Sequence, residues 1–257
     1  MQAINISVQL YSVRDFCKTP EQTAQSLAKL AKIGYRYVEA AGWCQGLDVS
    51  SFGKLVAEAG LKISSAHTGW NRFLTDLDTV IAEYKVFNCT HTATGGLPAE
   101  YFSLDGLKRF VGEIGPVAAK LAAAGMDFSY HNHSHELVRY GDKTWLAAMY
   151  EQAGPKVVKA EIDTFWIAAG GGDPAWWVRH SAGRAPLLHV KDMIVLADHT
   201  QRFAEVGEGN LNWSAIIKAA ADSGVQFAVV EQDNCYDRDP FDSLAISFRN
   251  LKAMGLS

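Results

Sequence analysis

Strand-like and helix-like segments alternate eight times along this chain, and no other feature constrains its fold as strongly. Apolar segments rich in β-branched residues predict strands at 4–10, 35–40, 61–67, 86–91, 126–132, 157–163, 186–192 and 225–231. The segments between them carry apolar residues at helical spacing. Because strand and helix alternate throughout, we expect parallel strands joined by right-handed crossovers.

Capping residues mark the ends of the predicted helices. Thr19 precedes Pro20 at the start of the first helix, and Gly34 follows its last turn. Three further glycines stand just ahead of predicted strands, at Gly60, Gly125 and Gly224. At these turns we expect a positive φ, which glycine adopts without steric cost.

Eight such units fill the 257 residues of the chain. A (β/α)8 TIM barrel has roughly 250 residues, or about 30 in each unit. We see no linker, so we predict one α/β domain, a TIM barrel over residues 1–257. A doubly wound open sheet is the alternative, but it needs a glycine-rich nucleotide turn after an early strand, and the first turns lack one.

Charge and cysteine spacing exclude several classes of function. The formal net charge of −4 provides no basic face for nucleic acid. The chain starts without a basic segment ahead of an apolar one, so we expect no secretory signal, no membrane attachment and a cytoplasmic protein. The four cysteines lack CxxC spacing, so neither a structural zinc site nor a disulfide framework is indicated.

Polar residues gather at the predicted carboxyl ends of the strands, where the active site of a TIM barrel forms. These residues are Gln9, Tyr11, Glu39, His67, His91, His131, Asn132, His133, Asp163, His189, Lys191, Asp192, Glu231 and Asp233. Histidines and carboxylates collected at one end of alternating elements point to a functional site.

Three of these residues form a plausible metal-binding set. Asp163, His189 and Glu231 come from three different predicted strands and offer oxygen and imidazole donors. Mixed donor sets suit Mn²⁺, Mg²⁺, Co²⁺ or Zn²⁺. We therefore predict one divalent metal ion as the cofactor, with manganese as the first choice.

The fourth ligand is expected from the stretch SYHNHSHEL at 129–137, which places a histidine at every second position. In a continuous strand the three histidines would spread over about 13 Å, too far for one ion to collect them. Only His131 lies at the mouth of the strand, so His131 is the predicted ligand.

The residues after His131 receive other roles. We expect Asn132 and His133 to hydrogen-bond a substrate, and His135 to face water in the loop. Glu136 could lean over the metal ion as a general acid or base. A solvated loop glutamate is the alternative for this residue.

Alternation along the strands also predicts an ion pair between Glu161 and Lys191 below the metal ion. Lys191 is equally a candidate to contact the substrate or its enolate. His67 and His91 are candidates for substrate binding, with a structural role as the alternative. Three aromatic residues are expected near the mouth: Trp43, Trp70 and Trp166. They either stack beneath a sugar ring or pack against the rim loops.

Several longer stretches carry a family resemblance. They are VQLYSVRD (8–15), YHNHSHEL (130–137), EIDTFWIAAGGGDP (161–174), LLHVKD (187–192), FAEVGEGNLNW (203–213) and VVEQD (229–233). Through them the chain resembles, over essentially its whole length, the xylose isomerase-like TIM-barrel superfamily. Within that superfamily it is similar to the sugar phosphate isomerases/epimerases.

This resemblance implies a divalent-metal isomerase or epimerase that acts on a keto-sugar or keto-polyol. In such enzymes the metal ion acts as a Lewis acid, acidifies the proton beside a carbonyl and stabilises an enediolate. The matching motifs imply that Asp163, His189 and Glu231 are ligands of strands six, seven and eight. They also imply that Glu231 moves the proton.

One departure from the family keeps a second reaction open. The family's epimerases usually carry a glutamate at the strand-five ligand position, where this chain has His131. Glu136 could replace that carboxylate. Alternatively the enediolate expels a substituent, which would make the protein a lyase or dehydratase on a keto-inositol or 3-keto-glycoside. A non-catalytic metal-binding barrel is a further alternative.

The expected partner is an unphosphorylated small molecule. Phosphate sites of barrels lie in the loops after strands seven and eight, and here those loops carry more acids than bases. An endonuclease of the same superfamily would need a basic DNA-binding face, which the net charge disfavours. A nucleotide-dependent dehydrogenase is disfavoured because no GxGxxG follows a strand. Assembly into a homo-oligomer is left open.

Overall fold

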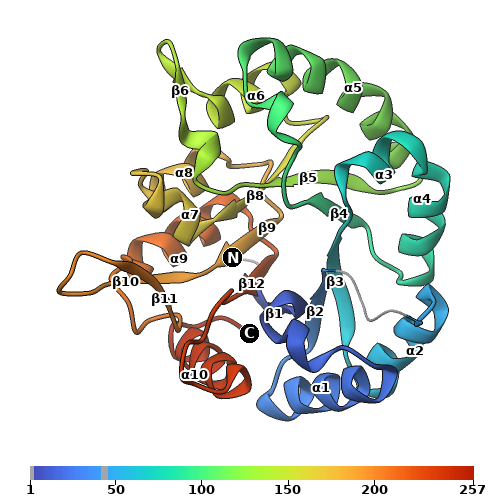
Figure 1. The fold of residues 1–257 in the computed structure, drawn as a ribbon, viewed down its shortest axis with the longest axis vertical. Helices are drawn as coiled ribbons and strands as arrows, with labels where there is room; N and C mark the ends of the chain where they lie inside the picture. The colour runs from blue at the N-terminus through green and yellow to red at the C-terminus, as the bar shows by residue number, and fades with distance from the viewer. Residues whose placement is uncertain (1–2, 42–45) are drawn as a thin grey trace.

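The protein is described by a computed structural model that covers residues 3–41 and 46–257. Within these residues, eight parallel strands close into a barrel in the order β1-β12-β9-β8-β5-β4-β3-β2 (Figure 1). The barrel strands are β1 (Asn5–Gln9), β2 (Tyr37–Ala40), β3 (Lys62–His67), β4 (His91–Thr94), β5 (Asp127–His131), β8 (Lys159–Asp163), β9 (Leu187–Val190) and β12 (Phe227–Val230). Each barrel strand lies beside the next barrel strand in the sequence, and the pair of β1 and β12 closes the barrel.

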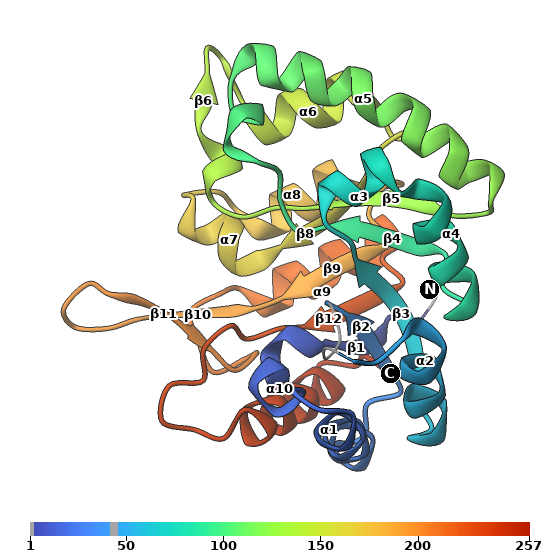
Figure 2. The same ribbon diagram turned by 45° about the vertical axis from the view of Figure 1, so that its right-hand side comes forward.

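Helices surround the barrel and cover its outer surface (Figure 2). They are α1 (Pro20–Ile33), α2 (Val49–Glu58), α3 (Trp70–Thr75), α4 (Leu77–Val86), α5 (Leu104–Ala123), α6 (Trp145–Ala153), α7 (Thr164–Ala169), α8 (Pro174–His180), α9 (Trp213–Ser223) and α10 (Pro240–Ala253). The predicted (β/α)8 TIM barrel is therefore confirmed. Among the described residues, no helix has the length and apolarity needed to cross a membrane.

The predicted helix ends are confirmed where they can be checked. The Thr19 side chain caps α1 by accepting a hydrogen bond from the Gln22 amide, and Pro20 occupies the first turn. Gly34 follows α1 with a φ of 127°. The other predicted turn glycines also have positive φ, namely Gly60, Gly125 and Gly224. These local signals set where each helix stops and the next strand begins.

The fourth strand lies later in the chain than predicted. The sequence predicts a strand at 86–91, but Val86 ends α4 and β4 runs from His91 to Thr94. The apolar residues there belong to the helix end, where the Phe87 ring packs 5.7 Å from that of Phe52. His91 consequently starts its strand, and its Nδ1 lies 2.8 Å from Asp127 Oδ2 at the start of β5. The expectation that His91 belongs to the mouth is wrong.

Two small antiparallel ribbons were not predicted. One pairs β6 (Arg139–Tyr140) with β7 (Lys143–Thr144), and the other pairs β10 (Asp192–Val195) with β11 (Gln201–Ala204). The β10–β11 hairpin projects away from the barrel in Figures 1 and 2. Its strands run from buried residues at the base to exposed residues at the outer end, so they lack the alternation of apolar residues that reveals a half-buried strand.

The base of the β10–β11 hairpin is organised by the fully buried carboxylate of Asp192. This side chain accepts hydrogen bonds from Met193 N (2.8 Å), Gly207 N (2.9 Å), Gly209 N (3.0 Å), Leu211 N (3.2 Å) and Trp213 Nε1 (2.6 Å). A buried carboxylate is tolerated when several donors replace water around it. Asp192 therefore has a structural role, although it follows strand seven among the candidate site residues.

Gly209 packs so closely against this carboxylate that a side chain there should destabilise the fold. An added Cβ would lie 2.5 Å from Asp192 Oδ1 and 2.5 Å from the Met193 carbonyl oxygen. We expect Gly209→Ala to lower the free energy of unfolding by about 1–3 kcal/mol, measured by urea denaturation. Gly112→Ala is the matched control, because no described heavy atom lies within 4 Å of its Cβ. In an exposed helix position it should stabilise by about 0.5–1 kcal/mol, and equal effects of the two changes would contradict the prediction.

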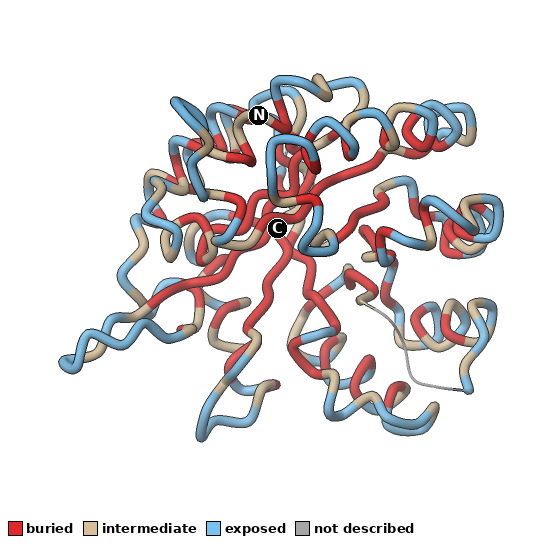
Figure 3. Tube along the Cα trace, turned by 45° about the horizontal axis from the view of Figure 1, so that its top comes forward, coloured by how far each residue is buried: buried red, intermediate tan, exposed pale blue. Residues whose placement is uncertain are grey.

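Figure 3 shows the barrel strands mostly buried and the outward faces of the helices exposed. The buried set includes charged residues that do not belong to an ordinary apolar core. They are Glu39, Glu136, Glu161, Asp163, Lys191, Asp192 and Glu231. Apart from Asp192 and Glu136, these side chains converge at one end of the barrel.

Candidate active site

A cavity of about 420 Å³ opens at the carboxyl ends of the barrel strands. Its lining residues are Gln9, Tyr11, Ala41, His67, Gly95, His131, His133, Trp166, Lys191, Phe203, Glu231 and Asp233. Residues from all eight barrel strands or the segments that follow them meet here, because parallel strands bring their carboxyl ends to the same face. This cavity is the candidate active site.

Four predicted ligands come together beside this cavity. Each of His131, Asp163, His189 and Glu231 offers one ligand atom, and these four atoms all lie within 4.8 Å of one another. The strands β5, β8, β9 and β12 that supply them are consecutive around the barrel. The structure thus contains a buried His/Asp/Glu cluster that can hold a metal ion.

An unpartnered atom within the cluster supports this interpretation. Asp163 caps α7, where its Oδ1 accepts a hydrogen bond from Trp166 N at 2.9 Å, and its other oxygen, Oδ2, lies 3.1 Å from Lys191 Nζ. His131 Nδ1 is buried and has no hydrogen-bond partner within the described residues. Buried polar atoms are normally satisfied, so an open imidazole nitrogen in a ligand set indicates an ion. Two carboxylates and two imidazoles form a donor set that suits a divalent cation.

His189 is held from both sides by carboxylates. Its Nδ1 lies 2.9 Å from Glu231 Oε2, and its Nε2 lies 2.7 Å from Glu39 Oε1. Glu39 is itself fixed by Gln9 Nε2 at 2.5 Å and by the Ser65 hydroxyl. A metal-bound histidine commonly gives its second ring nitrogen to such a carboxylate, which fixes the orientation of the ring. Glu39 fits this supporting role.

A second group of potential ligands lies deeper and shares two imidazoles with the first. It consists of His67, His131, Glu161 and His189. His67 Nε2 lies 2.7 Å from Glu161 Oε2, and the imidazoles of His189 and His67 outweigh burial in holding the Glu161 pKa well below its usual range. Glu161 is therefore a charged acceptor that orients the imidazoles from beneath.

The predicted ion pair between Glu161 and Lys191 is wrong. In the sheet register Glu161 lies opposite Leu187, and Asp163 lies opposite His189. Lys191 stands two residues beyond His189, so its backbone lies four residues farther along the strand direction than the level of Glu161, and its ammonium pairs with carboxylates nearer the mouth. Residue alternation correctly predicts which side of a strand a side chain faces, but it does not predict how far along the barrel axis that side chain lies.

Lys191 instead lies among the carboxylates of the mouth. Its Nζ is 2.7 Å from Glu231 Oε2, 3.1 Å from Asp163 Oδ2 and 3.2 Å from Asp233 Oδ2. Burial disfavours the ammonium form, but Asp163, Glu231 and Asp233 outweigh it and raise the pKa of Lys191. Lys191 is thus a permanent cation that lines the cavity, as a contact to substrate or enolate requires.

Buried carboxylates outnumber the buried lysine in this region. The carboxylates of Glu39, Glu161, Asp163 and Glu231 are buried together with the Lys191 ammonium and with the imidazoles of His67 and His189. The neighbouring carboxylates outweigh burial and raise the pKa values of both imidazoles. Burying carboxylates is costly unless a counter-ion or protons compensate for their charge. A divalent cation in the cluster would take over the compensation that protons on the imidazoles otherwise provide.

The imidazoles of His131 and His133, which line the cavity, are neutral. Burial lowers the pKa of His131 well below its usual range and lowers that of His133 to about 4. The His133 ring packs against Trp166 with 5.2 Å between centroids. His133 Nδ1 and Trp166 Nε1 are buried, and neither has a hydrogen-bond partner within the described residues. Both line the cavity, so they remain predicted substrate contacts, as does His67.

Glu136 and Asn132 do not lie where the sequence suggested. Glu136 is fully buried, and its two oxygens accept hydrogen bonds from the Tyr130 hydroxyl (2.8 Å) and His133 N (2.9 Å). The Asn132 side chain is also fully buried, and it accepts a hydrogen bond from Asp163 N (3.1 Å) and donates one to the His133 carbonyl (3.2 Å). Neither lines the cavity. Both hold the backbone around the cluster, and proton transfer by Glu136 and substrate contact by Asn132 stay predictions. The alternative of a solvated loop glutamate is wrong, because Glu136 is buried.

Of the three expected mouth tryptophans, Trp166 lines the cavity. Trp70 is buried in the aromatic core, with 3% of its surface exposed, and its ring lies 5.0 Å from that of Phe110. Trp43 lies outside the described residues. The cavity also contains residues to which the sequence gave no role. Gln9 and Asp233 stand at strand ends, but Phe203 comes from the unpredicted hairpin and only the stretch FAEVGEGNLNW could have indicated it.

Changing His131 to alanine should affect metal affinity far more than changing His135 to alanine. The His135 side chain is 49% exposed and lies in the 3-10 turn His135–Leu137, outside both groups of potential ligands. We expect His135→Ala to keep the manganese affinity of the parent protein, and His131→Ala to weaken it by roughly a hundredfold. Metal titration of the dialysed proteins measures both. A large loss with His135→Ala would instead support a cassette of three histidine ligands.

Comparison with known proteins places this geometry in context. A family model described as xylose isomerase-like TIM barrel matches residues 27–252. A solved sugar phosphate isomerase/epimerase from Parabacteroides distasonis is similar with a TM-score of 0.81 and 22% identity, over 99% of this chain and 96% of that one.

Two other solved structures are similar in fold. One is described as an L-ribulose 3-epimerase (TM-score 0.76, 19% identity, 100% of this chain and 95% of that one). The other is a "probable 3-DHS dehydratase" from Bacillus anthracis (TM-score 0.74, 15% identity, 97% of this chain and 99% of that one). No curated protein matches the chain. At these identities the solved structures support the fold of the barrel rather than a particular reaction.

Proposed function

The chain belongs to the xylose isomerase-like TIM-barrel family, and on that premise we propose that it is a metal-dependent isomerase or epimerase of a keto-sugar. The observation that carries this proposal is the buried group of His131, Asp163, His189 and Glu231 at the mouth of the barrel. Its two carboxylates, two imidazoles and open His131 Nδ1 suit one divalent cation, with manganese as our first choice. When bound, such an ion supplies Lewis-acid polarisation of a substrate carbonyl.

Glu231 is the residue that we assign to proton abstraction beside that carbonyl. It lines the cavity, and Lys191 and His189 outweigh burial and hold the pKa of its carboxyl well below the usual range. Glu231 is therefore ionised at neutral pH and able to accept a proton. Lys191 lies 2.7 Å from Glu231 Oε2 and can balance the negative charge that develops on a substrate oxygen.

The atom that receives the abstracted proton determines whether the enzyme is an isomerase or epimerase, or instead a lyase. The carboxylates that line the cavity, Glu231 and Asp233, both follow β12, whereas the neutral imidazoles of His131 and His133 come from β5 and the segment after it. Return of the proton to a substrate carbon gives an isomer or epimer. In a lyase, a proton would instead go to a departing group. Burial raises the pKa of Asp233 to about 6, which would let Asp233 supply this proton near neutral pH.

That one-sided arrangement is the specific observation that favours lyase or dehydratase activity as the second candidate. Similarity in fold to an L-ribulose 3-epimerase and to a probable 3-DHS dehydratase is compatible with both reactions. We propose an unphosphorylated substrate. Among the described lining residues, Lys191 is the one lysine or arginine, and carboxylates already surround it. A small molecule rather than nucleic acid is the proposed partner, given the net charge of −4.

Exchange of substrate hydrogen with solvent tests this function directly. The metal-loaded protein is incubated in D₂O with unphosphorylated keto-sugars, 3-keto-glycosides and inososes, and NMR follows deuterium at the carbon beside the carbonyl. Deuterium exchange accompanied by formation of a sugar isomer identifies an isomerase or epimerase. Deuterium exchange accompanied by loss of water or an aglycone identifies a lyase. If no compound exchanges while metal is bound, the assignment to an enolising enzyme of these compounds is wrong.

A further inference from the structure

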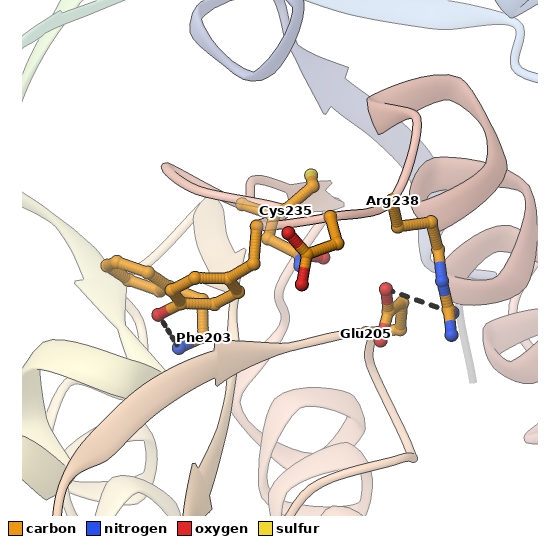
Figure 4. A pocket seen from close by; sticks show the side chains of 7 residues that line it. Phe203, Glu205, Cys235 and Arg238 are labelled. Atoms are coloured by element: carbon orange, nitrogen blue, oxygen red, sulfur yellow. Dashed lines mark hydrogen bonds and ion pairs between the residues drawn. The ribbon is translucent and has the colours of Figure 1, made fainter.

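A second cavity, of about 460 Å³, lies beside the candidate active site, and Phe203 lines both. The other residues that line it are Glu205, Gln232, Cys235, Tyr236, Asp237 and Arg238. Figure 4 shows Phe203 and Glu205 on one side of this cavity, and Cys235 and Arg238 on the loop that faces them. The loop begins at the end of β12, so the same segment that carries Glu231 and Asp233 also forms a wall of the second cavity.

Tyr236 is held in an unusual conformation at this cavity. Its φ is 54°, a region that residues other than glycine adopt with strain. Its hydroxyl accepts a hydrogen bond from Phe203 N at 3.2 Å, and the Arg202 guanidinium lies 4.8 Å from its ring centroid. These contacts fix the tyrosine against the hairpin, although its side chain stays 42% exposed. Such strain is characteristic of ligand-binding segments.

The charges of the second cavity disfavour an anionic ligand. Arg238 is the one cationic residue among the described lining residues, and its Nη1 lies 3.1 Å from Glu205 Oε1. Asp237 adds a further carboxylate. A phosphate or carboxylate group would therefore meet no unpaired positive charge there. Two aromatic rings with a neutralised ion pair suit an uncharged ring that can stack.

Phe203 connects this surface to the chemistry. Its ring stacks on Phe165 with 4.1 Å between centroids, and Lys191 Nζ lies 5.9 Å from its centroid. A sugar held near Lys191 would therefore have Phe203 as a neighbour. A group joined to that sugar would extend past Phe203 toward Tyr236.

We infer that the second cavity binds the second ring of the substrate, an uncharged sugar or aryl group joined to the keto-sugar by a glycosidic bond. This inference rests on the proposed function and narrows its substrate class from free keto-sugars to keto-glycosides. Tyr236 acts here as a specificity-determining residue, while the residues around Lys191 hold the sugar that reacts.

Binding of paired, unreactive glycosides tests the inference. Calorimetry measures dissociation constants of the metal-loaded protein for the methyl and 4-nitrophenyl forms of α-glucoside, β-glucoside and β-galactoside. For at least one pair we expect the 4-nitrophenyl form to bind roughly fivefold more tightly. Tyr236→Ala should remove this preference, and Tyr236→Phe, which keeps the ring, should retain it. Trp176→Ala is the control for nonspecific binding, because Trp176 is 46% exposed and lies on α8.

Equal affinity within every pair, no measurable binding of any pair, or a preference that survives Tyr236→Ala would overturn the inference. Thermal unfolding of each variant checks that it is folded, which is expected for a half-exposed side chain. The measurement needs no turnover. An aryl preference without solvent exchange of any substrate would leave the second subsite standing and refute the proposed reaction. Solvent exchange without an aryl preference would support the proposed reaction and refute the second subsite.

Discussion

Replacing Glu231 with glutamine is expected to lower the rate of solvent-hydrogen exchange at the substrate by roughly a thousandfold. The amide keeps the size of the side chain and an oxygen for Lys191, but it cannot accept the substrate proton. The protein should stay folded, because Lys191 retains Asp163 at 3.1 Å and Asp233 at 3.2 Å. NMR exchange in D₂O and thermal unfolding measure the two properties separately.

The matched control for this change is Glu151→Gln. Glu151 lies on α6 with its side chain 60% exposed and pairs with Lys143 at the surface. Removing a surface ion pair has little effect on stability and should leave the exchange rate unchanged. If Glu231→Gln kept the full rate, another group would have to be the base and the proposed mechanism would be wrong.

Removing the metal ion should abolish exchange and lower the thermal stability of the protein. Without a divalent ion, the buried carboxylates of Glu39, Glu161, Asp163 and Glu231 have only Lys191 and protons on the His67 and His189 imidazoles to balance them within the described residues. A ligand that binds only the folded state stabilises it by about 2.7 kcal/mol at about a hundred times its Kd. For a chain of this length that corresponds to roughly 5–10 °C in Tm. Calorimetry before and after chelation, then with added manganese, measures the shift.

His131→Ala is the informative control for chelation. This variant should respond little to chelator or manganese because one of its four ligands is missing. The parent protein should recover both activity and Tm when the ion is returned. An unchanged Tm and unchanged exchange after complete removal of metal from the parent would show that the cluster balances its charge with protons alone.

The barrel could be predicted from sequence because each strand and helix carries its own local signal. Thr19, Pro20 and Gly34 delimit α1, and apolar segments mark most barrel strands. The signal failed at β4, whose sequence HTAT is short and polar. The neighbouring apolar pair of Val86 and Phe87 was assigned to a strand, although Val86 ends a helix and Phe87 packs beside it.

The site was predictable to the extent that it depends on the ends of parallel strands. Barrel geometry alone brings His131, Asp163, His189 and Glu231 to one face. The placement of Glu136 could not be predicted, because it depends on a 3-10 turn that directs the side chain toward Tyr130. Phe203 could not be predicted either, since its hairpin is specified by long-range hydrogen bonds to Asp192.

The hydrogen bonds to Asp192 have a consequence for how this protein can diversify. The carboxylate fixes both ends of the segment between Met193 and Leu211, so the hairpin tip is free to vary in length and sequence without shifting the base. Phe203 pairs with Met193 next to the base, so replacing the whole hairpin would change Phe203 and its surroundings while leaving Lys191 and the ligand group in place. A graft of this hairpin from a relative should therefore transfer substrate preference as a module, with the reaction chemistry inherited from the recipient barrel.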